Sequence, residues 1–339
     1  MSTAPEYHID QPFLTPHNLL GEGPTYVPST DEFFFLDIHR CQIAYLKVPT
    51  DSATYTVAPS NEAGGAPAIE VFSTSAAVAT RTTYPDSPIG VLALLPDSPD
   101  RFLVGAKYGF AVASPKKNAE LEYKADVYAS DPEKRAIMRF NDGNVDPAGR
   151  FVAGSMKQEN PTSVGSLFKL ETDGTASVIF DECAIPNGLQ WSADGKTMFH
   201  IESTKFTVFA YDYDVSTGTV SNKRPFVVFD NGEECDGMTI SEQGDLFIAV
   251  WNGRRVEQRC SKTGALKAKY FLPAARVTCP TFGGKNLDEL YVTTASLHAD
   301  DLEYVWTEED AKKDQGGEIF KFKIPGQNGV PRGVYKGSI

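Results

Sequence analysis

Short apolar runs recur along the chain at a regular spacing, each preceded by a turn of Gly, Asp, Asn or Pro. Each of the six runs has the length and composition of a buried β-strand: Phe33–Leu36, Phe102–Ala106, Phe151–Ala153, Met198–Ile201, Leu246–Val250 and Leu290–Thr293. Four of the five gaps between run centres are about 44–49 residues, and the first gap is longer. This period is typical of propeller blades, so the sequence predicts an all-β fold, a β-propeller.

Further strands of alternating pattern follow most of these runs: Ile43–Val48, Ser166–Leu170, Val208–Tyr213, Arg255–Arg259 and Glu318–Ile324. Several end in turns such as Asp173-Gly174 and Thr263-Gly264, where a left-handed Gly suits a hairpin. We interpret the six apolar runs as the innermost strands of the blades. In a propeller, loops from every blade converge at one end of a central channel. Polar residues at equivalent places in successive repeats are therefore the candidates for a site.

Two irregular segments interrupt the repeats of what we expect to be a single domain over residues 1–339. Residues 51–86 are rich in Ser, Thr, Ala and Pro, and we interpret most of this segment as a surface insertion in the first or second blade. Residues 302–315 are charged and predict a short helix with Thr307 as its N-cap. Neither segment contains a candidate catalytic group.

Composition narrows the class of protein. The 339 residues are 41% apolar, and the net charge is −13 without any block of Lys and Arg, which argues against nucleic acid or an anionic membrane as partner. The five cysteines include no Cys-x-x-Cys pair, so we expect neither a disulfide framework nor a thiolate zinc site. No stretch approaches 18 apolar residues. We expect a cytoplasmic protein that is a monomer or a weak homo-oligomer.

Three segments place an oxygen-bearing side chain beside Gly. Glu22 lies between two glycines, Asn187 lies in Pro186-Asn187-Gly188, and Asp236 precedes Gly237. Taken singly, the first is most simply a solvated Glu and the second a tight turn. Asn187 and Asp236, however, stand at equivalent places in adjacent repeats. We therefore expect both side chains to point into the channel.

A fourth segment lies one repeat earlier and contains Arg139 and Asn141. Two residues apart, these side chains share one face of a strand and can reach a polar substrate together. For Asp142 and Asp146 in the same segment, we favour hydrogen bonds to backbone amides of an Asx-rich loop over a role in chemistry.

In order and spacing, these segments resemble the senescence-marker-protein-30/gluconolactonase/regucalcin family. The resemblance covers nearly the whole chain apart from the two insertions, and rests on residues 21–24, 139–154, 186–192, 209–214, 236–238, 282–284 and 290–293. It implies a six-bladed propeller with one divalent metal ion in the channel, held by Glu22, Asn187 and Asp236. It also implies sugar contacts from Arg139, Asn141 and Glu159.

The sequence departs from the family pattern at three positions. Glu202 stands where the family usually has Asp, Tyr26 where it usually has Trp, and Cys235 where many members have Pro. These departures bear on the shape of the substrate more than on the metal site.

The implied ligands are chemically coherent. Two carboxylates and an amide oxygen are hard ligands that suit Ca²⁺, Mg²⁺ or Mn²⁺, and Zn²⁺ also accepts carboxylates. Three protein ligands leave positions open for water and substrate, as in a catalytic site. We expect hydrolysis of a sugar lactone to its acid, with the carbonyl polarised by the metal ion and with Asp236 taking a proton from the attacking water.

Other functions remain open at this point. An esterase or phosphotriesterase on the same fold, a calcium-binding regulatory protein of regucalcin type with little turnover, and a protein-interaction propeller are the alternatives. The chain has no Gly-x-Ser-x-Gly elbow, His-Glu-x-x-His helix or phosphate-binding loop. His200 lies within an apolar run, where we expect a core residue rather than a substrate contact.

Overall fold

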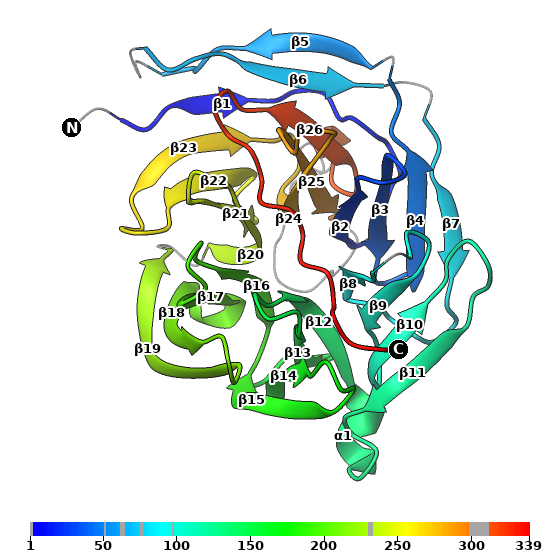
Figure 1. The fold of residues 1–339 in the computed structure, drawn as a ribbon. Coiled ribbons are helices and arrows are strands. Elements are labelled where there is room, and N and C mark those ends of the chain that lie inside the picture. Colours follow the sequence, from blue (N-terminus) through cyan, green and yellow to red (C-terminus); the bar gives the residue numbers. More distant parts are fainter. Residues whose placement is uncertain are drawn as a thin grey trace. The chain divides into compact units, whose positions relative to one another are not determined.

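The computed structural model consists almost entirely of β-strands, arranged in six sheets (Figure 1). It describes residues 3–50, 52–61, 65–74, 77–96, 98–229, 233–297 and 312–339. The fold is a six-bladed β-propeller, as predicted from the period of the apolar runs.

Each sheet contains four consecutive strands or three consecutive strands with additions from elsewhere in the chain. The first sheet holds β2 (Gly21–Val27), β3 (Glu32–Asp37), β4 (Gln42–Lys47) and β7 (Thr80–Thr83). The second holds β8 (Val91–Leu94), β9 (Phe102–Gly105), β10 (Gly109–Ala113) and β11 (Leu121–Asp126). The third holds β12 (Met138–Val145), β13 (Phe151–Lys157), β14 (Gly165–Leu170) and β15 (Ala176–Cys183).

The remaining sheets follow the same plan. The fourth holds β16 (Pro186–Trp191), β17 (Thr197–Glu202), β18 (Thr207–Asp214) and β19 (Thr219–Val228). The fifth holds β20 (Glu234–Ile240), β21 (Asp245–Trp251), β22 (Arg255–Cys260), β23 (Leu266–Phe271) and the N-terminal β1 (Glu6–His8), which pairs in parallel with β23. The sixth holds β24 (Arg276–Gly283), β25 (Glu289–Ala295), β26 (Ile319–Lys323), β6 (Ile69–Ser73) and β5 (Ala53–Val57).

The apolar runs are the second strands of the sheets, not the innermost ones as we had interpreted them. They fall in β3, β9, β13, β17, β21 and β25. Each sheet begins one strand earlier, at β2, β8, β12, β16, β20 or β24. Two of these end strands begin with residues that are typical of turns when read alone: β2 begins with Gly21 and β16 with Pro186. Pairing with the apolar second strand holds them extended nonetheless, so Pro186-Asn187-Gly188 starts a strand rather than forming a turn.

By their internal contacts the residues form two compact units. One comprises residues 1–39, 45–80 and 238–330, and the other comprises residues 40–44, 81–237 and 331–339. In the first unit, a core of buried residues that includes Tyr270, Phe320 and Phe322 packs between sheets. In the second, Phe140 and Phe151 belong to the corresponding core.

The predicted insertion at residues 51–86 contains three strands, of which only β7 belongs to the first sheet. The hairpin β5–β6 extends the sixth sheet instead, with Phe72 opposite Lys321 of β26, which corrects its assignment to the first or second blade. The predicted helix at residues 302–315, with its N-cap Thr307, lies largely outside the described residues.

The predicted hairpin glycines have left-handed backbones, with φ of 86° at Gly174 and 72° at Gly264.

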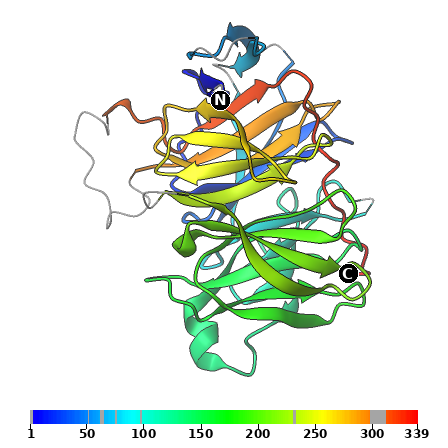
Figure 2. The ribbon, with the colours of Figure 1, turned by 90° about the vertical axis from the view of Figure 1, so that its left-hand side faces the viewer.

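Two short helices were not predicted: α1 (Pro132–Ile137), the teal coil at the lower edge of Figures 1 and 2, and η1 (Ser203–Lys205). Across the described part of the chain, every helix is too short and polar to span a bilayer. The five cysteines all lie in the described residues, and none of them forms a disulfide bond.

Candidate active site

β-Bulges lie at the predicted site residues of three end strands. In β2 the pairing with β3 shifts after Glu22, and in β16 the pairing with β17 shifts after Asn187. In β12 the shift falls between Phe140 and Gly143, so that Asn141 lies in the bulge. A bulge leaves a residue out of the ladder and redirects nearby side chains, which is why bulges occur beside active sites.

Arg139 and Asn141 are in direct contact. Arg139 Nη1 donates to Asn141 Oδ1 at 2.8 Å and to the carbonyl oxygen of Phe140 at 3.0 Å. Asn141 Nδ2 in turn donates to Asn187 Oδ1 at 2.9 Å and to the carbonyl oxygen of Pro186 at 3.0 Å. Hydrogen bonds therefore join β12 of the third sheet to β16 of the fourth.

The amide of Asn187 is held from both sides in a buried setting, because its side chain is only 6% exposed. Its Oδ1 accepts from Asn141, and its Nδ2 donates to Ser203 Oγ at 2.9 Å. These partners define which end of the amide is oxygen. A carbonyl oxygen has two lone pairs, so Oδ1 can accept from Asn141 and still coordinate a cation.

Ser203 carries the connection on to the fifth sheet. Its Oγ donates to the carbonyl oxygen of Cys235 at 2.7 Å. Cys235 directly precedes Asp236, whose side chain is buried at 7% exposure. Four of the predicted residues (Arg139, Asn141, Asn187 and Asp236) thus lie on neighbouring end strands that are joined by direct hydrogen bonds.

Glu22 lies in the other unit, near the start of β2, and is also buried at 7% exposure. The backbone N–H of Gly23 donates to its Oε2 at 3.0 Å, with Gly23 at a φ of 51° that favours glycine. Leu19 and Leu20 come just before β2, and their N–H groups donate to the carboxylate of Asp37, the last residue of β3, at 3.0 and 3.3 Å. These bonds fix the path of the chain towards Glu22.

Glu159 differs from the other predicted residues because it is exposed. It lies in the loop that follows β13.

The carboxylate of Glu202 binds backbone N–H groups of the segment before β16. Its carboxylate accepts from the N–H groups of Ala184 and Ile185 at 3.1 and 2.9 Å, and from Thr204 Oγ1 at 2.9 Å. At 3% exposure it therefore ties down the segment that leads into β16. Glu202, which stands where the family usually has the shorter Asp, therefore has a structural role.

The two Asp residues that we assigned to backbone hydrogen bonds do make them. Asp142 Oδ1 accepts from Gly143 N at 2.7 Å, and Asp146 Oδ1 accepts from Arg150 N at 2.8 Å. Asp146 also forms a buried ion pair with Arg150. Burial raises the pKa of the Asp142 carboxyl to about 6, against the opposing effects of the Gly143 N–H and of the positive charge of Arg332.

His200 is a core residue, as expected, with 2% exposure and its ring edge-on to Phe180 at 5.5 Å between centroids. Neither ring nitrogen has a hydrogen-bond partner. Burial lowers the pKa of His200 to about 3, with smaller contributions from Lys223 and Lys205. The imidazole is therefore neutral at ordinary pH.

Each of the three predicted metal ligands carries an oxygen donor of a kind that binds divalent cations. Glu22 and Asp236 provide carboxylates that are more than nine-tenths buried, and Asn187 provides an oriented amide oxygen. Oxygen donors of this kind suit Ca²⁺, Mg²⁺ or Mn²⁺. Within the described ranges there is no cluster of three or more His, Cys, Asp or Glu side chains able to hold a metal ion. A set that includes an amide oxygen is compatible with that finding.

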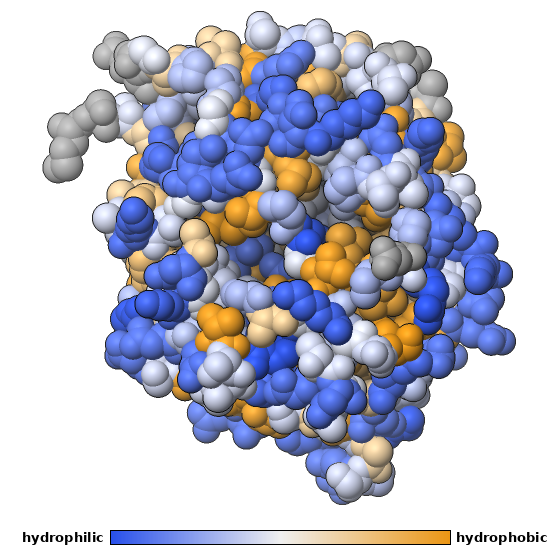
Figure 3. All heavy atoms as spheres, viewed as in Figure 1, coloured by the Kyte–Doolittle hydropathy of each residue, from blue (hydrophilic) through white to orange (hydrophobic). Residues whose placement is uncertain are grey.

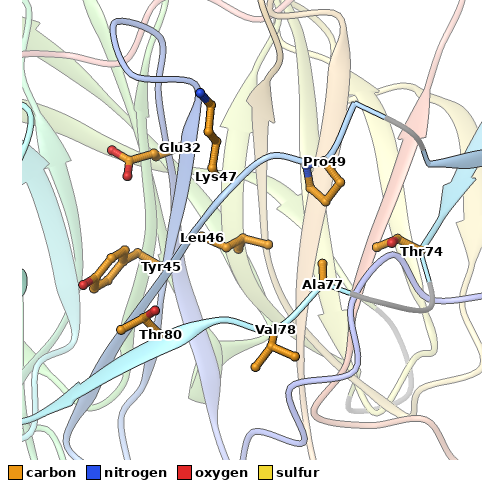
Figure 4. Close-up of a pocket in the computed structure, with 9 residues that line it drawn as sticks. All are labelled: Glu32, Tyr45, Leu46, Lys47, Pro49, Thr74, Ala77, Val78 and Thr80. Carbon is orange, nitrogen blue, oxygen red and sulfur yellow. The ribbon is translucent and has the colours of Figure 1, made fainter.

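A cavity of about 410 Å³ lies elsewhere, in the first unit (Figure 4). Its lining includes the apolar Leu46 and Val78, and its charged residues are Glu32 and Lys47. None of the predicted site residues lines it, so the predicted chemistry does not belong there.

Residues 20–296 match the family described as SMP-30/Gluconolactonase/LRE-like region. The chain belongs to this family. The match confirms the resemblance found in the sequence, and it spans every predicted site residue.

Relatives of the SMP-30/gluconolactonase/LRE-like chain include regucalcin of Gallus gallus, which is 36% identical over 251 residues, or 71% of this chain and 82% of the relative. Among solved structures, a luciferin-regenerating enzyme is 28% identical with a TM-score of 0.78, covering 95% of this chain and 96% of its own. A calcium-binding regucalcin of Agrobacterium tumefaciens has the same TM-score at 22% identity, covering 98% and 99%, and shows the shared fold.

The sequence did not reveal the role of Ser203, which it showed only as the last residue of the segment that contains Glu202. The sequence also did not indicate a role for the hydroxyl of Thr278, which donates to the Gly21 oxygen, because no equivalent polar residue recurs in the other repeats.

Proposed function

We propose that this protein is a metal-dependent lactonase that hydrolyses a sugar lactone to the corresponding sugar acid. The supporting observation is the series of contacts from Arg139 through Asn141 and Asn187 to Ser203 and Cys235. It joins the side chains expected to contact a sugar to those expected to hold a cation, in a chain whose family is named in part for gluconolactonase.

In this proposal Glu22, Asn187 and Asp236 hold one divalent ion, which is Ca²⁺, Mg²⁺, Mn²⁺ or Zn²⁺. Bound there, the ion supplies Lewis-acid polarisation of the lactone carbonyl. Asn187 contributes through an amide oxygen whose direction is set by its own Nδ2 bond to Ser203.

Asp236 takes a proton from the attacking water. The water oxygen bonds to the carbonyl carbon, the bond from that carbon to the ring oxygen breaks, and the proton passes to the ring oxygen. The product is an open-chain hydroxy acid, and no covalent bond to the protein forms. The burial of Asp236 at 7% exposure limits competing bulk water around the carboxylate.

Arg139, Asn141 and Glu159 bind the hydroxyl groups of the sugar. Arg139 offers N–H donors, and Asn141, two residues further along β12, offers the second lone pair of its Oδ1, because both N–H groups of its Nδ2 are already bonded to Pro186 and Asn187. The contact between Arg139 and Asn141 fixes their spacing. Glu159 would act from the exposed loop after β13. Because a site that pairs hydroxyl groups leaves its own polar atoms unsatisfied with a deoxy analogue, it discriminates against that analogue.

The test is acid release from a panel of aldono-lactones, together with simple esters and a phosphotriester, after removal of metal with a chelator. Ca²⁺, Mg²⁺, Mn²⁺ or Zn²⁺ is then restored one at a time. We expect turnover of one or more sugar lactones that requires a restored ion. Turnover of esters or the phosphotriester alone would contradict the choice of substrate and favour the esterase alternative.

A calcium-binding regulatory role is the second candidate, because a relative at 36% identity is named regucalcin. It predicts calcium binding without hydrolysis of any lactone. It also predicts that Asp236→Asn, if it still binds the ion, keeps the function. The lactonase proposal predicts that the same variant loses turnover.

A protein-interaction propeller has less support. On the face shown in Figure 3, apolar side chains lie in small groups between hydrophilic ones rather than in one broad patch. Large exposed apolar patches are the usual mark of a docking surface.

A further inference from the structure

One feature recurs at all three predicted metal ligands: a side chain from a distant part of the chain binds the backbone carbonyl of the residue just before the ligand. The three bonds are Asn141 Nδ2 to the Pro186 oxygen at 3.0 Å, Ser203 Oγ to the Cys235 oxygen at 2.7 Å, and Thr278 Oγ1 to the Gly21 oxygen at 2.6 Å. Pro186, Cys235 and Gly21 directly precede Asn187, Asp236 and Glu22. Asn141 is already a predicted substrate contact, whereas the two hydroxyl groups have no role so far.

Ser203 is 2% exposed and lies directly after β17, at the first residue of η1. Its hydroxyl donates to the Cys235 oxygen and accepts from Asn187 Nδ2. One oxygen atom therefore connects the amide of one predicted ligand to the peptide that carries the next, Asp236. Loss of this hydroxyl would leave a buried N–H and a buried carbonyl without that partner.

Thr278 is fully buried and occupies the bulge of β24, where pairing with β25 shifts between Val277 and Cys279. The bulge turns its hydroxyl towards β2, where it donates to the Gly21 oxygen. Thr293 Oγ1 lies 2.9 Å from Thr278 Oγ1 and limits its rotation further. A β-branched side chain is already restricted at χ1, so the direction of this bond is well fixed.

Binding a carbonyl fixes the peptide plane between that residue and the next. The plane sets the backbone of the following residue and hence the direction in which its side chain leaves. At Gly21 the neighbours are close as well: a Cβ there would lie 2.6 Å from the carbonyl oxygen of Thr294. The backbone before Glu22 thus has little room to shift, provided the bond from Thr278 is made.

We propose that Ser203 and Thr278 are positioning residues that set the directions of the Asp236 and Glu22 carboxylates, respectively, for cation binding, through the carbonyls that precede them. This inference rests on the metal site of the proposed function. Groups that orient metal ligands in this way typically change metal affinity by about 10- to 100-fold when removed.

The chain offers matched controls. Thr294 is fully buried, and its hydroxyl donates to the Glu318 oxygen at 2.6 Å. Ser155 is fully buried, and its hydroxyl lies 3.2 Å from the Ser166 oxygen, to which it can donate. Neither accepting residue precedes a predicted ligand. Thr294→Val and Ser155→Ala therefore each remove a buried hydroxyl that binds no carbonyl before a predicted ligand, and both keep the backbone oxygen of Thr294 that faces Gly21.

The experiment is calorimetric titration of chelator-treated protein with Ca²⁺ and with Mn²⁺. Ser203→Ala and Thr278→Val are expected to weaken binding about tenfold or more, and the two controls by no more than about twofold. Thr278→Ser retains the hydroxyl and is expected to restore most of the affinity. Wild-type binding with all four variants alike would overturn the inference while leaving the metal site intact.

A second readout needs no metal. Hydrogen exchange of the metal-free proteins is followed over peptides that cover residues 20–26 and 234–240. Faster exchange at 234–240 in Ser203→Ala and at 20–26 in Thr278→Val, with no such change in the controls, supports the positioning role. Unchanged exchange in both variants overturns it. Absence of any ion binding by the wild type would instead refute the proposed metal site. The exchange result would still show whether the two hydroxyl groups hold the backbone before Asp236 and Glu22.

Discussion

The side-chain amide of Asn141 donates to Oδ1 of Asn187 at 2.9 Å, across the junction of the third and fourth sheets. This contact links a predicted sugar-binding residue to a predicted metal ligand. A change at one is therefore expected to affect the function of the other.

Asn141→Ala is expected to raise KM for the lactone and to destabilise the protein by about 1–3 kcal/mol, because it leaves buried acceptors without their donor. Asn141→Asp should be worse, since it places a carboxylate oxygen against two oxygen atoms. Steady-state kinetics and chemical denaturation measure the two effects. Asn144→Ala is the matched control, because Asn144 Nδ2 donates from the same strand to the Leu189 oxygen of β16 at 3.1 Å. An equal rise of KM in the control would contradict the assignment.

Gly154 of β13 packs against the residue before Asn187, and a Cβ there would lie 2.4 Å from Pro186 Cβ and Cγ. Gly154→Ala is therefore expected to push Pro186 aside, costing about 1–3 kcal/mol of stability and lowering metal affinity. Thermal unfolding measures the loss of stability, and metal titration measures the loss of affinity. Gly174→Ala is the control: its Cβ meets open space, so metal affinity should stay at the wild-type value, although the positive φ of Gly174 adds some strain. Metal affinity that stays at the wild-type value in Gly154→Ala would show that Pro186 does not determine the position of Asn187.

His200 makes stability depend on pH. Its pKa is lowered to about 3 by burial, so between pH 6.5 and 3 the unfolded chain binds a proton that the folded chain does not. The stability that neutral His200 provides is therefore complete above pH 6.5 and is lost as the pH falls. Between pH 7 and 5, the wild type should lose about 2 kcal/mol more than His200→Leu. Urea denaturation at the two pH values checks this, and parallel losses in the two proteins would refute it.

Asp146 holds a buried charge pair that joins two sheets. Arg150 Nε and Tyr213 OH both lie 2.6 Å from Asp146 Oδ2. Asp146→Ala leaves Arg150 buried without this partner and is expected to cost about 3–5 kcal/mol, with kcat of the folded fraction unchanged. Asp212→Ala breaks an exposed pair with Arg224 and should cost no more than about 1 kcal/mol. Similar losses in both variants, measured by denaturation, would contradict this difference between buried and exposed pairs.

The period of the apolar runs was sufficient to predict the six blades, because the second strand of each sheet is buried on both faces and therefore reads as a continuous apolar segment. The end strands were not recognised. Asn187 and Asp236 lie near the starts of β16 and β20, in segments that look like turns, and pairing with β17 and β21 keeps these segments extended. The hairpin β5–β6 was misassigned because its partner, Lys321, lies about 250 residues further along the chain, a pairing that no local pattern encodes.

The candidate site was predictable to the extent that its residues repeat. Asn187 and Asp236 stand at equivalent places, and the structure puts both on end strands of adjacent sheets. The hydroxyl groups of Ser203 and Thr278 act through bonds to carbonyl oxygens in other sheets, and such bonds depend on register rather than on residue type.

The most direct test of the lactonase account compares wild type with Asp236→Ala in a pH-stat assay of aldono-lactone hydrolysis. Both proteins are first stripped of metal, and then one ion is restored. The account predicts that acid release by the wild type needs the ion and that Asp236→Ala releases no acid above the spontaneous rate with or without it. Equal turnover by the two proteins, or turnover by the wild type that persists in chelator, would contradict the account.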